Sequence, residues 1–142
     1  MRTTILLLLL IAFVGVSTST AQNRFSRVVT DASLWDPVNI SSSTECEGSA
    51  SECAVKMLDE QNIDVGESPL FSVYRLGEVN EKSVTVVFVS HKVNDDDSVA
   101  GMLYRIELSL SDVEDRSFSL GAIGRMYKCM RGRKGWSKRP CL

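Results

Sequence analysis

The chain has 142 residues, of which 44% are hydrophobic and 24% are charged, with 16 lysines and arginines against 18 acidic residues. This composition is typical of a folded globular protein and argues against a disordered, collagen-like or nucleic-acid-coating chain. The length suffices for one domain with one hydrophobic core, and it excludes a two-domain enzyme with an interdomain cleft.

Residues 1–21 predict a secretory signal peptide. Arg2 gives the segment a positive start, Ile5 to Val16 form an apolar run, and Ser19-Thr20-Ala21 places small residues where cleavage occurs. A membrane anchor is the weaker alternative, because the apolar run is shorter than the roughly 20 residues that span a bilayer. We therefore expect a secreted, extracellular protein whose mature chain starts at Gln22 and spans no membrane.

The four cysteines are Cys46, Cys53, Cys129 and Cys141. In an oxidising compartment an even set of cysteines indicates two disulfides, although the sequence allows three pairings. We favour Cys46–Cys53 and Cys129–Cys141, because each pair closes a short local loop. A zinc site is the rival interpretation, but the C-x2-C spacing is absent and His91 is the only histidine.

The mature chain divides into an irregular N-terminal segment, residues 22–48, and a folded domain, residues 49–142. The first segment shows little periodicity, although a short strand near Phe25 to Val29 is compatible with it. Asn39-Ile40-Ser41 is an N-glycosylation sequon, which predicts a glycoprotein with a modified surface residue at Asn39.

The folded domain begins with a predicted helix. Ser49 and Glu52 form a capping-box pattern, and one face carries apolar residues at helical spacing. Strands follow at Leu70 to Leu76, Ser83 to Val93, Met102 to Leu110 and Ser117 to Met130, the last with a potential break at Gly121 or Gly124. The order predicts an α+β fold in which one helix packs on an antiparallel sheet of about four to five strands.

Charge is unevenly distributed along the chain. Eight basic residues and no acidic residue lie between Arg116 and Leu142, whereas 16 of the 18 acids lie between Glu45 and Asp115. A basic tail can attract phosphate, heparin-like glycans or anionic membranes. The alternative is a solvated chain end that pairs with the acidic body. No nucleic-acid-binding module accompanies the tail, so nucleic acid is not an expected partner.

Catalytic signatures are missing from the sequence. There is no G-x-S-x-G, P-loop, H-E-x-x-H or dinucleotide-binding motif, and His91 lies within a predicted strand. Asp95-Asp96-Asp97 lacks the spacing and terminal glutamate of an EF-hand, so a solvated turn is the simpler interpretation. We therefore expect no enzyme activity, no catalytic residue, no cofactor and no metal.

Residues 97–108 resemble the cystatin family, in which an inhibitory hairpin loop reads Q-x-V-x-G and leads into a strand of the form Y-x-x-x-V-E-L. Here the loop positions hold Asp97-Ser98-Val99-Ala100-Gly101, and the strand follows as Tyr104-Arg105-Ile106-Glu107-Leu108. Cys129 and Cys141 flank Gly135-Trp136, which is similar to the Pro-Trp of the family's second loop. The resemblance covers roughly residues 50–141.

The resemblance implies a cystatin-like fold and a secreted, monomeric inhibitor of papain-like cysteine proteases of the cathepsin type. The family's loops fill the protease cleft, and the implied protease-binding residues are Asp97, Ser98, Val99, Ala100, Gly101, Gly135 and Trp136. A small loop with a large aromatic anchor suits such a contact.

Three features depart from the family pattern. Asp97 replaces glutamine, Gly135 replaces proline, and no glycine lies between Gln22 and Glu47. If Leu70 to Leu76 is the first strand of the sheet after the helix, the hairpin loop falls instead at Gly77 to Lys82. The alternative function is then a small secreted α+β binding protein without protease inhibition, whose basic C-terminal tail binds an anionic surface or partner.

Overall fold

The computed structural model describes residues 26–41, 45–79, 82–93, 98–112 and 117–142. The chain forms two compact units, Met1–Asp31 and Ala32–Leu142. The predicted signal peptide and Gln22 lie outside the described residues. In the first unit residues 26–30 are helical, so the strand considered near Phe25 to Val29 is wrong over 26–29. Backbone and side-chain bonds between residues four apart account for the helical turn: Asp31 N–H donates to the Arg27 carbonyl at 2.8 Å, and Thr30 Oγ1 donates to the Ser26 carbonyl at 2.9 Å.

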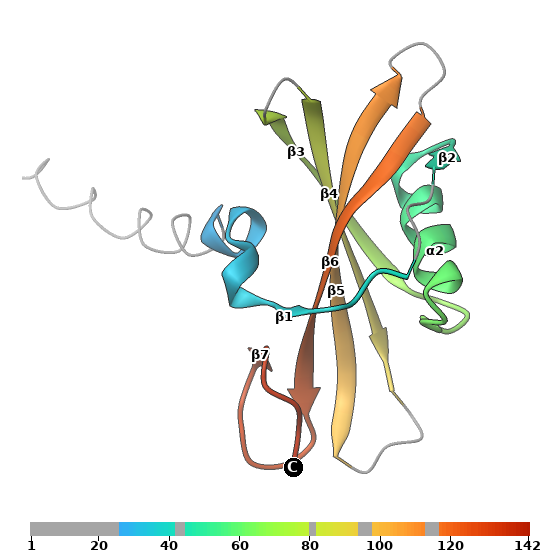
Figure 1. Ribbon diagram of the computed structural model, residues 1–142. Coiled ribbons are helices and arrows are strands. Elements are labelled where there is room, and N and C mark those ends of the chain that lie inside the picture. Colours follow the sequence, from blue (N-terminus) through green and yellow to red (C-terminus); the bar gives the residue numbers. More distant parts are fainter. Residues whose placement is uncertain (1–25, 42–44, 80–81, 94–97, 113–116) are drawn as a thin grey trace, which may run out of the picture. The chain divides into compact units, whose positions relative to one another are not determined.

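The second unit is an antiparallel sheet with one α-helix on one of its faces (Figure 1). In the described part of the chain the elements are η1 Ala32–Leu34, β1 Asp36–Pro37, β2 Glu45–Glu47, α2 Ala50–Glu60, β3 Leu70–Val79, β4 Lys82–Lys92, β5 Val99–Asp112, β6 Ser117–Cys129 and β7 Trp136–Ser137. The four long strands form a meander in the order β6-β5-β4-β3. The short strands β1, β2 and β7 all pair with β6, at different points along its outer edge.

Helix α2 forms as the sequence predicts. Ser49 is the N-cap, its hydroxyl accepts from the Glu52 N–H, and the Glu52 carboxylate accepts from the Ser49 N–H at 3.0 Å. This reciprocal arrangement satisfies two backbone donors that the first helical turn leaves without partners. The helix ends at Glu60, and Asn62 takes a positive φ of 59° immediately afterwards. The capping box therefore fixes the register in which the apolar face of α2 meets the sheet.

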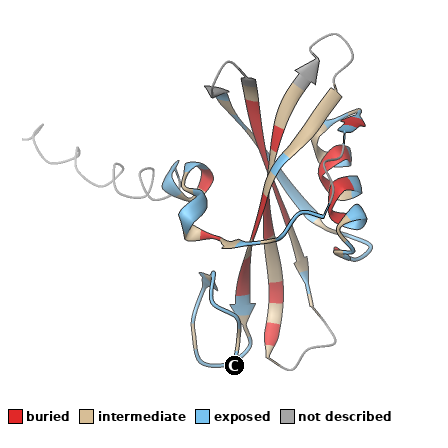
Figure 2. Cartoon of the chain, viewed as in Figure 1, coloured by how far each residue is buried: buried red, intermediate tan, exposed pale blue. Residues whose placement is uncertain are grey.

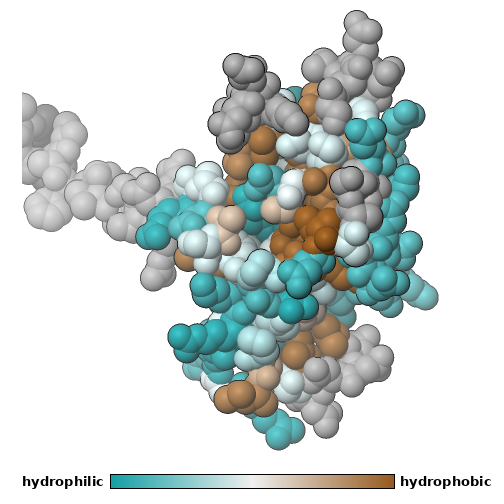
Figure 3. Space-filling view, viewed as in Figure 1, coloured by the Kyte–Doolittle hydropathy of each residue, from teal (hydrophilic) through white to brown (hydrophobic). Residues whose placement is uncertain are grey.

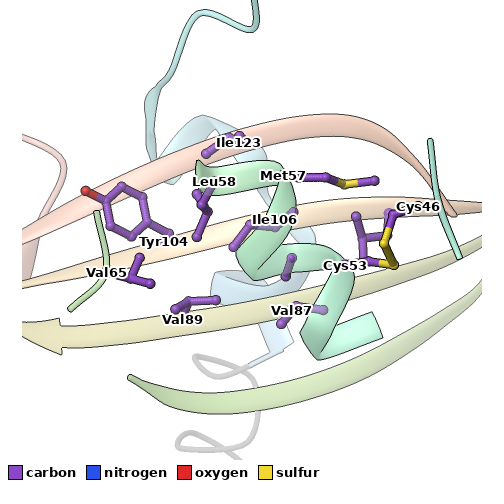
Figure 4. Close-up of a cluster of buried hydrophobic side chains, with 12 residues drawn as sticks. Cys46, Cys53, Met57, Leu58, Val65, Val87, Val89, Tyr104, Ile106 and Ile123 are labelled. Atoms are coloured by element: carbon purple, nitrogen blue, oxygen red, sulfur yellow. A yellow bond between two sulfur atoms is a disulfide. The ribbon is translucent and has the colours of Figure 1, made fainter. Parts of the chain in front are cut away.

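The main core lies between α2 and the sheet (Figure 4). Met57 and Leu58 from the helix are completely buried against Val87, Val89 and Ile106 from the two central strands, β4 and β5. Full burial of one such aliphatic side chain contributes about 1.5–3 kcal/mol to folding. Alternation along β4 and β5 directs every second residue to this face, and the residues of β4 between them are buried on the other face, so Val84 to Val89 form one continuous buried stretch (Figure 2).

The opposite face of the sheet is packed by aromatic side chains. Trp35 is 3% exposed and stacks on Phe88 with ring centroids 5.4 Å apart, and Tyr74 contacts Phe88 from the other side at 5.4 Å. Gly124 makes the packing of Trp35 possible, because a Cβ at that position would lie 2.6 Å from the Trp35 Cβ. Apolar residues on both parities of β4 thus pack on two sides of the sheet.

The predicted fold class is wrong in its proportions. Seven strands are present in the described sheet, against the four to five expected, and the helix has only 11 residues. The molecule is therefore more β-rich than a helix packed on a small sheet. The difference comes from β1, β2 and β7, which have two or three residues each and are too short to produce a visible alternation. Two of them lie in the segment predicted to be irregular, and β6 is not broken at Gly121 or Gly124.

Both predicted disulfides are present, Cys46–Cys53 and Cys129–Cys141, each with a Cα–Cα distance of 5.5 Å. The first joins β2 to α2 within the core, and the second closes the chain after β6. Two disulfides fit an extracellular protein. Over the residues that the structure describes, no helix has the length and apolar character needed to cross a bilayer.

Candidate functional site

The segment after β6 is a loop closed by a disulfide, residues 129–141, which we call the C-terminal loop. Strand β7 lies inside it and pairs with β6, so that Trp136 is opposite Lys128 and Ser137 is opposite Tyr127. Gly132 and Gly135 have φ values of 82° and 80°, a region in which other residues are strained. The disulfide and this short ladder together hold the C-terminal loop against one end of the sheet (Figure 1).

Arg133 braces the C-terminal loop from within. Its guanidinium donates to the Ser137 hydroxyl at 2.5 Å and to the carbonyls of Arg139 at 2.8 Å and Pro140 at 3.2 Å. The Ser137 hydroxyl also accepts from the Arg139 N–H at 3.1 Å. A guanidinium that donates to several groups of its own loop supports the backbone, so we assign Arg133 a structural function. The groups available to a ligand are its exposed neighbours.

Four residues on neighbouring strands form a row across the sheet. Lys92 of β4 is paired with Gly101 of β5, Gly101 with Lys128 of β6, and Lys128 with Trp136 of β7. Paired residues of antiparallel strands point to the same face, and this row lies on the face opposite α2. We call these four residues the Trp136 row.

The Trp136 ring extends over Gly101. A Cβ placed on Gly101 would lie 3.5 Å from the Trp136 Cη2 atom and 3.0 Å from the His91 carbonyl oxygen. The glycine thus leaves space for the indole, which remains 43% exposed. Lys92 and Lys128 are also exposed. The row therefore presents a partly fixed aromatic surface with one ammonium group from β4 and one from β6, the two strands that flank β5.

Further cations surround the Trp136 row on the C-terminal loop. Exposed basic side chains lie at Arg131, Lys134, Lys138 and Arg139, and no acidic residue follows Asp115. Among the residues described, none of these four cations nor Lys128 forms a salt bridge, and the Lys138 ammonium donates to the Ser33 carbonyl at 2.9 Å. In Figure 3 the end of the molecule that carries the C-terminal loop is mostly hydrophilic. Uncompensated like charges close together create a positive potential that favours an anionic ligand.

The structure assigns different surroundings to the residues that the resemblance marked as protease-binding. Val99, Ala100 and Gly101 lie in β5, where Val99 is 9% exposed and Gly101 is buried. The Ser98 carbonyl accepts from the Met130 N–H at 2.8 Å, and Asp97 lies outside the described residues. Gly135 and Trp136 are exposed on the C-terminal loop.

Two of these predicted residues meet, although they come from distant parts of the sequence. Gly101 and Trp136 lie close together, since a Cβ on Gly101 would reach the Trp136 ring, and the Ser98–Met130 bond joins the same two segments. However, β3 is the first strand after α2 and pairs with β4, so the first hairpin after the helix connects Val79 to Lys82. Segment 99–101 instead follows the second hairpin connection, at the same end of the sheet as β7 (Figure 1).

A second polar cluster lies on the helix-facing side of the sheet and was not predicted. The Asp36 carboxylate accepts from Arg125 Nε at 2.7 Å and from the Tyr127 hydroxyl at 3.1 Å. The hydrogen bond from Arg125 is the main reason that the pKa of Asp36 is lowered, and the Tyr127 hydroxyl acts in the same direction. Burial raises the pKa of Tyr127 and that of the neighbouring Tyr104. The negative charge of Asp36 and the positive charge of Arg125 compensate each other within this cluster. The cluster therefore joins β1 to β6 and does not offer either charge to a ligand.

Two further predicted features can be located. Asn39 is exposed in the segment after β1, as a glycosylated residue must be. His91 stacks on Tyr104 with ring centroids 6.0 Å apart, and its Nδ1 is 3.2 Å from the Lys92 carbonyl oxygen. Within the described ranges, no group of three histidine, cysteine, aspartate or glutamate residues is placed to hold a metal ion.

Comparison with known proteins adds no relative: no family model matches the chain, and neither a curated protein nor a solved structure matches it.

Proposed function

We propose that this protein is secreted and binds an anionic, sulfated polysaccharide through the Trp136 row and the C-terminal loop. The observation that carries the proposal is the position of Trp136 between exposed cations, on a backbone fixed by a disulfide. Nothing in the proposal requires a catalytic group, a metal or a cofactor.

The chemistry of such a polysaccharide matches the row group by group. A pyranose ring has a face of C–H groups, which packs on an exposed indole and buries apolar surface there. Sulfate and carboxylate groups project from the rim of the sugar and accept charge-assisted hydrogen bonds from ammonium groups. Lys92 and Lys128 lie on either side of Gly101, over which the indole extends. One sugar unit on Trp136 therefore brings its anionic substituents within reach of these lysines.

The charge distribution along the chain also favours binding of a polyanion at the C-terminal loop. Along the sequence, 16 of the 18 acids lie between Glu45 and Asp115, including Asp95 to Asp97 in the connection from β4 to β5, whereas the stretch from Arg116 to Leu142 has eight cations and no acid. A polyanion approaching this molecule is repelled by the first and attracted by the second, which orients its encounter with the C-terminal loop.

The test is affinity for heparin measured as a function of salt, with the protein purified from the medium of a secreting host. We expect retention that falls as salt rises, because ionic contacts at an exposed surface are screened. The Lys92→Ala/Lys128→Ala variant should elute at clearly lower salt, whereas Lys56→Ala, which removes an exposed lysine on α2, is the matched control and should elute with the wild type. Equal elution of all three proteins would refute the proposal, as would binding to anionic lipid vesicles in the absence of binding to heparin.

A second candidate function is inhibition of a papain-like cysteine protease, and one observation favours it. Gly101 and Trp136, which the resemblance assigns to two separate inhibitory loops, lie close together at one end of the sheet. Against it, Val99 is 9% exposed and Gly101 is paired with a strand on both sides, so the exposed members of this set among the described residues are Gly135 and Trp136.

Titration of papain with the protein at micromolar concentration separates the two candidates. Inhibition that disappears in the combined Gly101→Glu/Trp136→Ala variant would favour the protease inhibitor. No inhibition by the wild type at this concentration would eliminate that function and leave the polysaccharide proposal unaffected.

A further inference from the structure

The two edges of the described sheet differ. The outer edge of β6 is paired along its length with β2, β1 and β7 in turn, whereas β3 pairs with β4 and with no other described strand. β3 is ten residues long, so its other side presents a row of backbone N–H and C=O groups without strand partners in the described chain. Long edges of this kind pair readily with another strand.

The side chains along this edge are unusually apolar. Leu70 is 74% exposed, Phe71 41% and Val73 48%, although large apolar residues are ordinarily buried. Figure 2 shows this exposed stretch of β3 beside the buried stretch of β4. Phe71 also lines a shallow groove between α2 and β3 together with Val55 and Ile63. The apolar surface thus continues from the strand edge toward the helix.

The residues of β3 are self-complementary when two copies of the strand are related by a two-fold axis at Val73. An axis perpendicular to the sheet through Val73 makes two copies of β3 antiparallel and keeps α2 on the same face in both. Paired residues then point to the same face. Val73 meets Val73 of the second copy, Leu70 meets Leu76, Phe71 meets Arg75 and Ser72 meets Tyr74.

Charge and backbone features favour the same register. Arg75 is the only charged residue between Leu70 and Leu76, and opposite Phe71 its guanidinium contacts an aromatic ring, which is a favourable cation–π arrangement. No two like charges face each other within this stretch. Pro69, which lacks an N–H donor, is opposite Gly77, where the β3–β4 ladder is bulged and φ is 84°. The regular part of the edge therefore ends at the same place on both strands.

We propose that β3 is the interface of a homodimer in which two copies pair antiparallel about Val73 and form one continuous sheet. This goes beyond the polysaccharide site, which lies at β7, and it does not depend on that function. A second copy fits this edge better than an unrelated strand, because the apolar residues and the single charge of each copy find suitable partners in the other copy.

The experiment measures the mass of the secreted protein by sedimentation and by light scattering over about a hundredfold range of concentration. We expect twice the mass of one chain at the upper end of the range. Val73→Lys places two ammonium groups opposite each other at the axis, and Val73→Glu places two carboxylates there, so each variant alone should have the mass of one chain. Ile40→Lys, which changes another exposed apolar residue away from β3, is the control and should remain dimeric.

A mixture of the two variants gives the sharpest result. Lysine of one copy then faces glutamate of the other, and an equimolar mixture of Val73→Lys and Val73→Glu should recover the mass of a dimer. A monomeric wild type at every concentration would overturn the proposal. A dimeric Val73→Lys variant, or a mixture that stays monomeric, would overturn the register about Val73.

Hydrogen exchange gives an answer that does not depend on the variants being folded. In the wild type, amides of residues 70–76 that face the interface should exchange faster on dilution, because dissociation exposes them. Exchange rates in this stretch that are identical at all concentrations would contradict the dimer.

Discussion

Replacing Trp136 by alanine tests the central residue of the proposed polysaccharide site. A tryptophan side chain offers about 250 Å² of surface, and Trp136 is 43% exposed, so about 100 Å² is available to a ligand. At about 25 cal/mol per Å², covering all of it contributes about 2.5 kcal/mol, which corresponds to about 70-fold in affinity. A sugar that covers only one face of the ring uses about half of this surface, which gives about 1.2 kcal/mol or about eightfold.

Titration calorimetry with a heparin oligosaccharide at constant salt measures this change directly. We expect the dissociation constant of Trp136→Ala to rise between about eightfold and 70-fold, and that of Trp136→Phe to rise less, because phenylalanine keeps a ring. The slope of affinity against salt should be unchanged in both, since neither substitution removes a charge. Lys128→Ala should do the reverse and reduce the salt dependence.

Two results would refute this reasoning. An affinity of Trp136→Ala within about twofold of the wild type would be smaller than covering even half of the exposed ring predicts, and would remove the indole from the site. A changed salt dependence in that variant would show that the loop had rearranged. The urea unfolding midpoint of Trp136→Ala is the accompanying control, because more than half of this side chain is buried and its loss also lowers the stability; the binding assay is run under conditions in which the variant is folded.

Three further predictions concern stability, each measured by urea unfolding. Asp36→Asn should lower the free energy of unfolding at neutral pH by about 1 kcal/mol, a modest loss because the ion pair between Asp36 and Arg125 is partly exposed. Since the pKa of Asp36 is lowered in the folded state, this stabilisation is present above the ordinary carboxyl range and is lost as the pH falls through the lowered folded value. A difference between variant and wild type that persists in acid would contradict this prediction. Gly124→Ala should cost about 2 kcal/mol, because the new methyl group meets Trp35, and an unchanged midpoint would show that Trp35 packs elsewhere. The serine double variant of Cys129 and Cys141 should lose about 3 kcal/mol through the opened loop, and a loss well under about 1 kcal/mol would show that the loop is held by its other contacts.

The sequence predicts the long elements of this fold well, because each has a clear local signal. The capping pattern at Ser49 and Glu52 and the apolar face behind it identify α2, and alternation identifies β3 to β6. Residues 26–30 and the short strands lack such a signal. β1 and β2 are strands only because the outer edge of β6 supplies their partners, so nothing in their own residues could have indicated them.

The candidate site was partly predictable. The basic C-terminus and Trp136 stand out in the sequence, and the short cysteine spacing indicates that they belong to one closed loop. The neighbourhood of Trp136 could not be predicted, since Lys92 is far from it along the chain and reaches the row only through the registers of three strand pairs. These registers depend on a bulge between Val99 and Gly101, and a shift of one residue would move every side chain to the other face.

The two edges of the sheet differ in how they are covered. The outer edge of β6 is closed by β2, β1 and β7, and the last of these pairings also positions Trp136 beside Lys128. Because β7 consists of only two residues, it depends on the Cys129–Cys141 bond to stay in place, and reduction of that bond should release the binding row while β3 is unaffected. In the proposed function, this covalently reinforced sheet edge presents the ligand-binding surface. The other edge carries Leu70, Phe71 and Val73 exposed, and such an edge is prone to aggregation unless a strand covers it. A second copy supplies that strand, and the failure of either inference leaves the other intact because they lie on opposite edges.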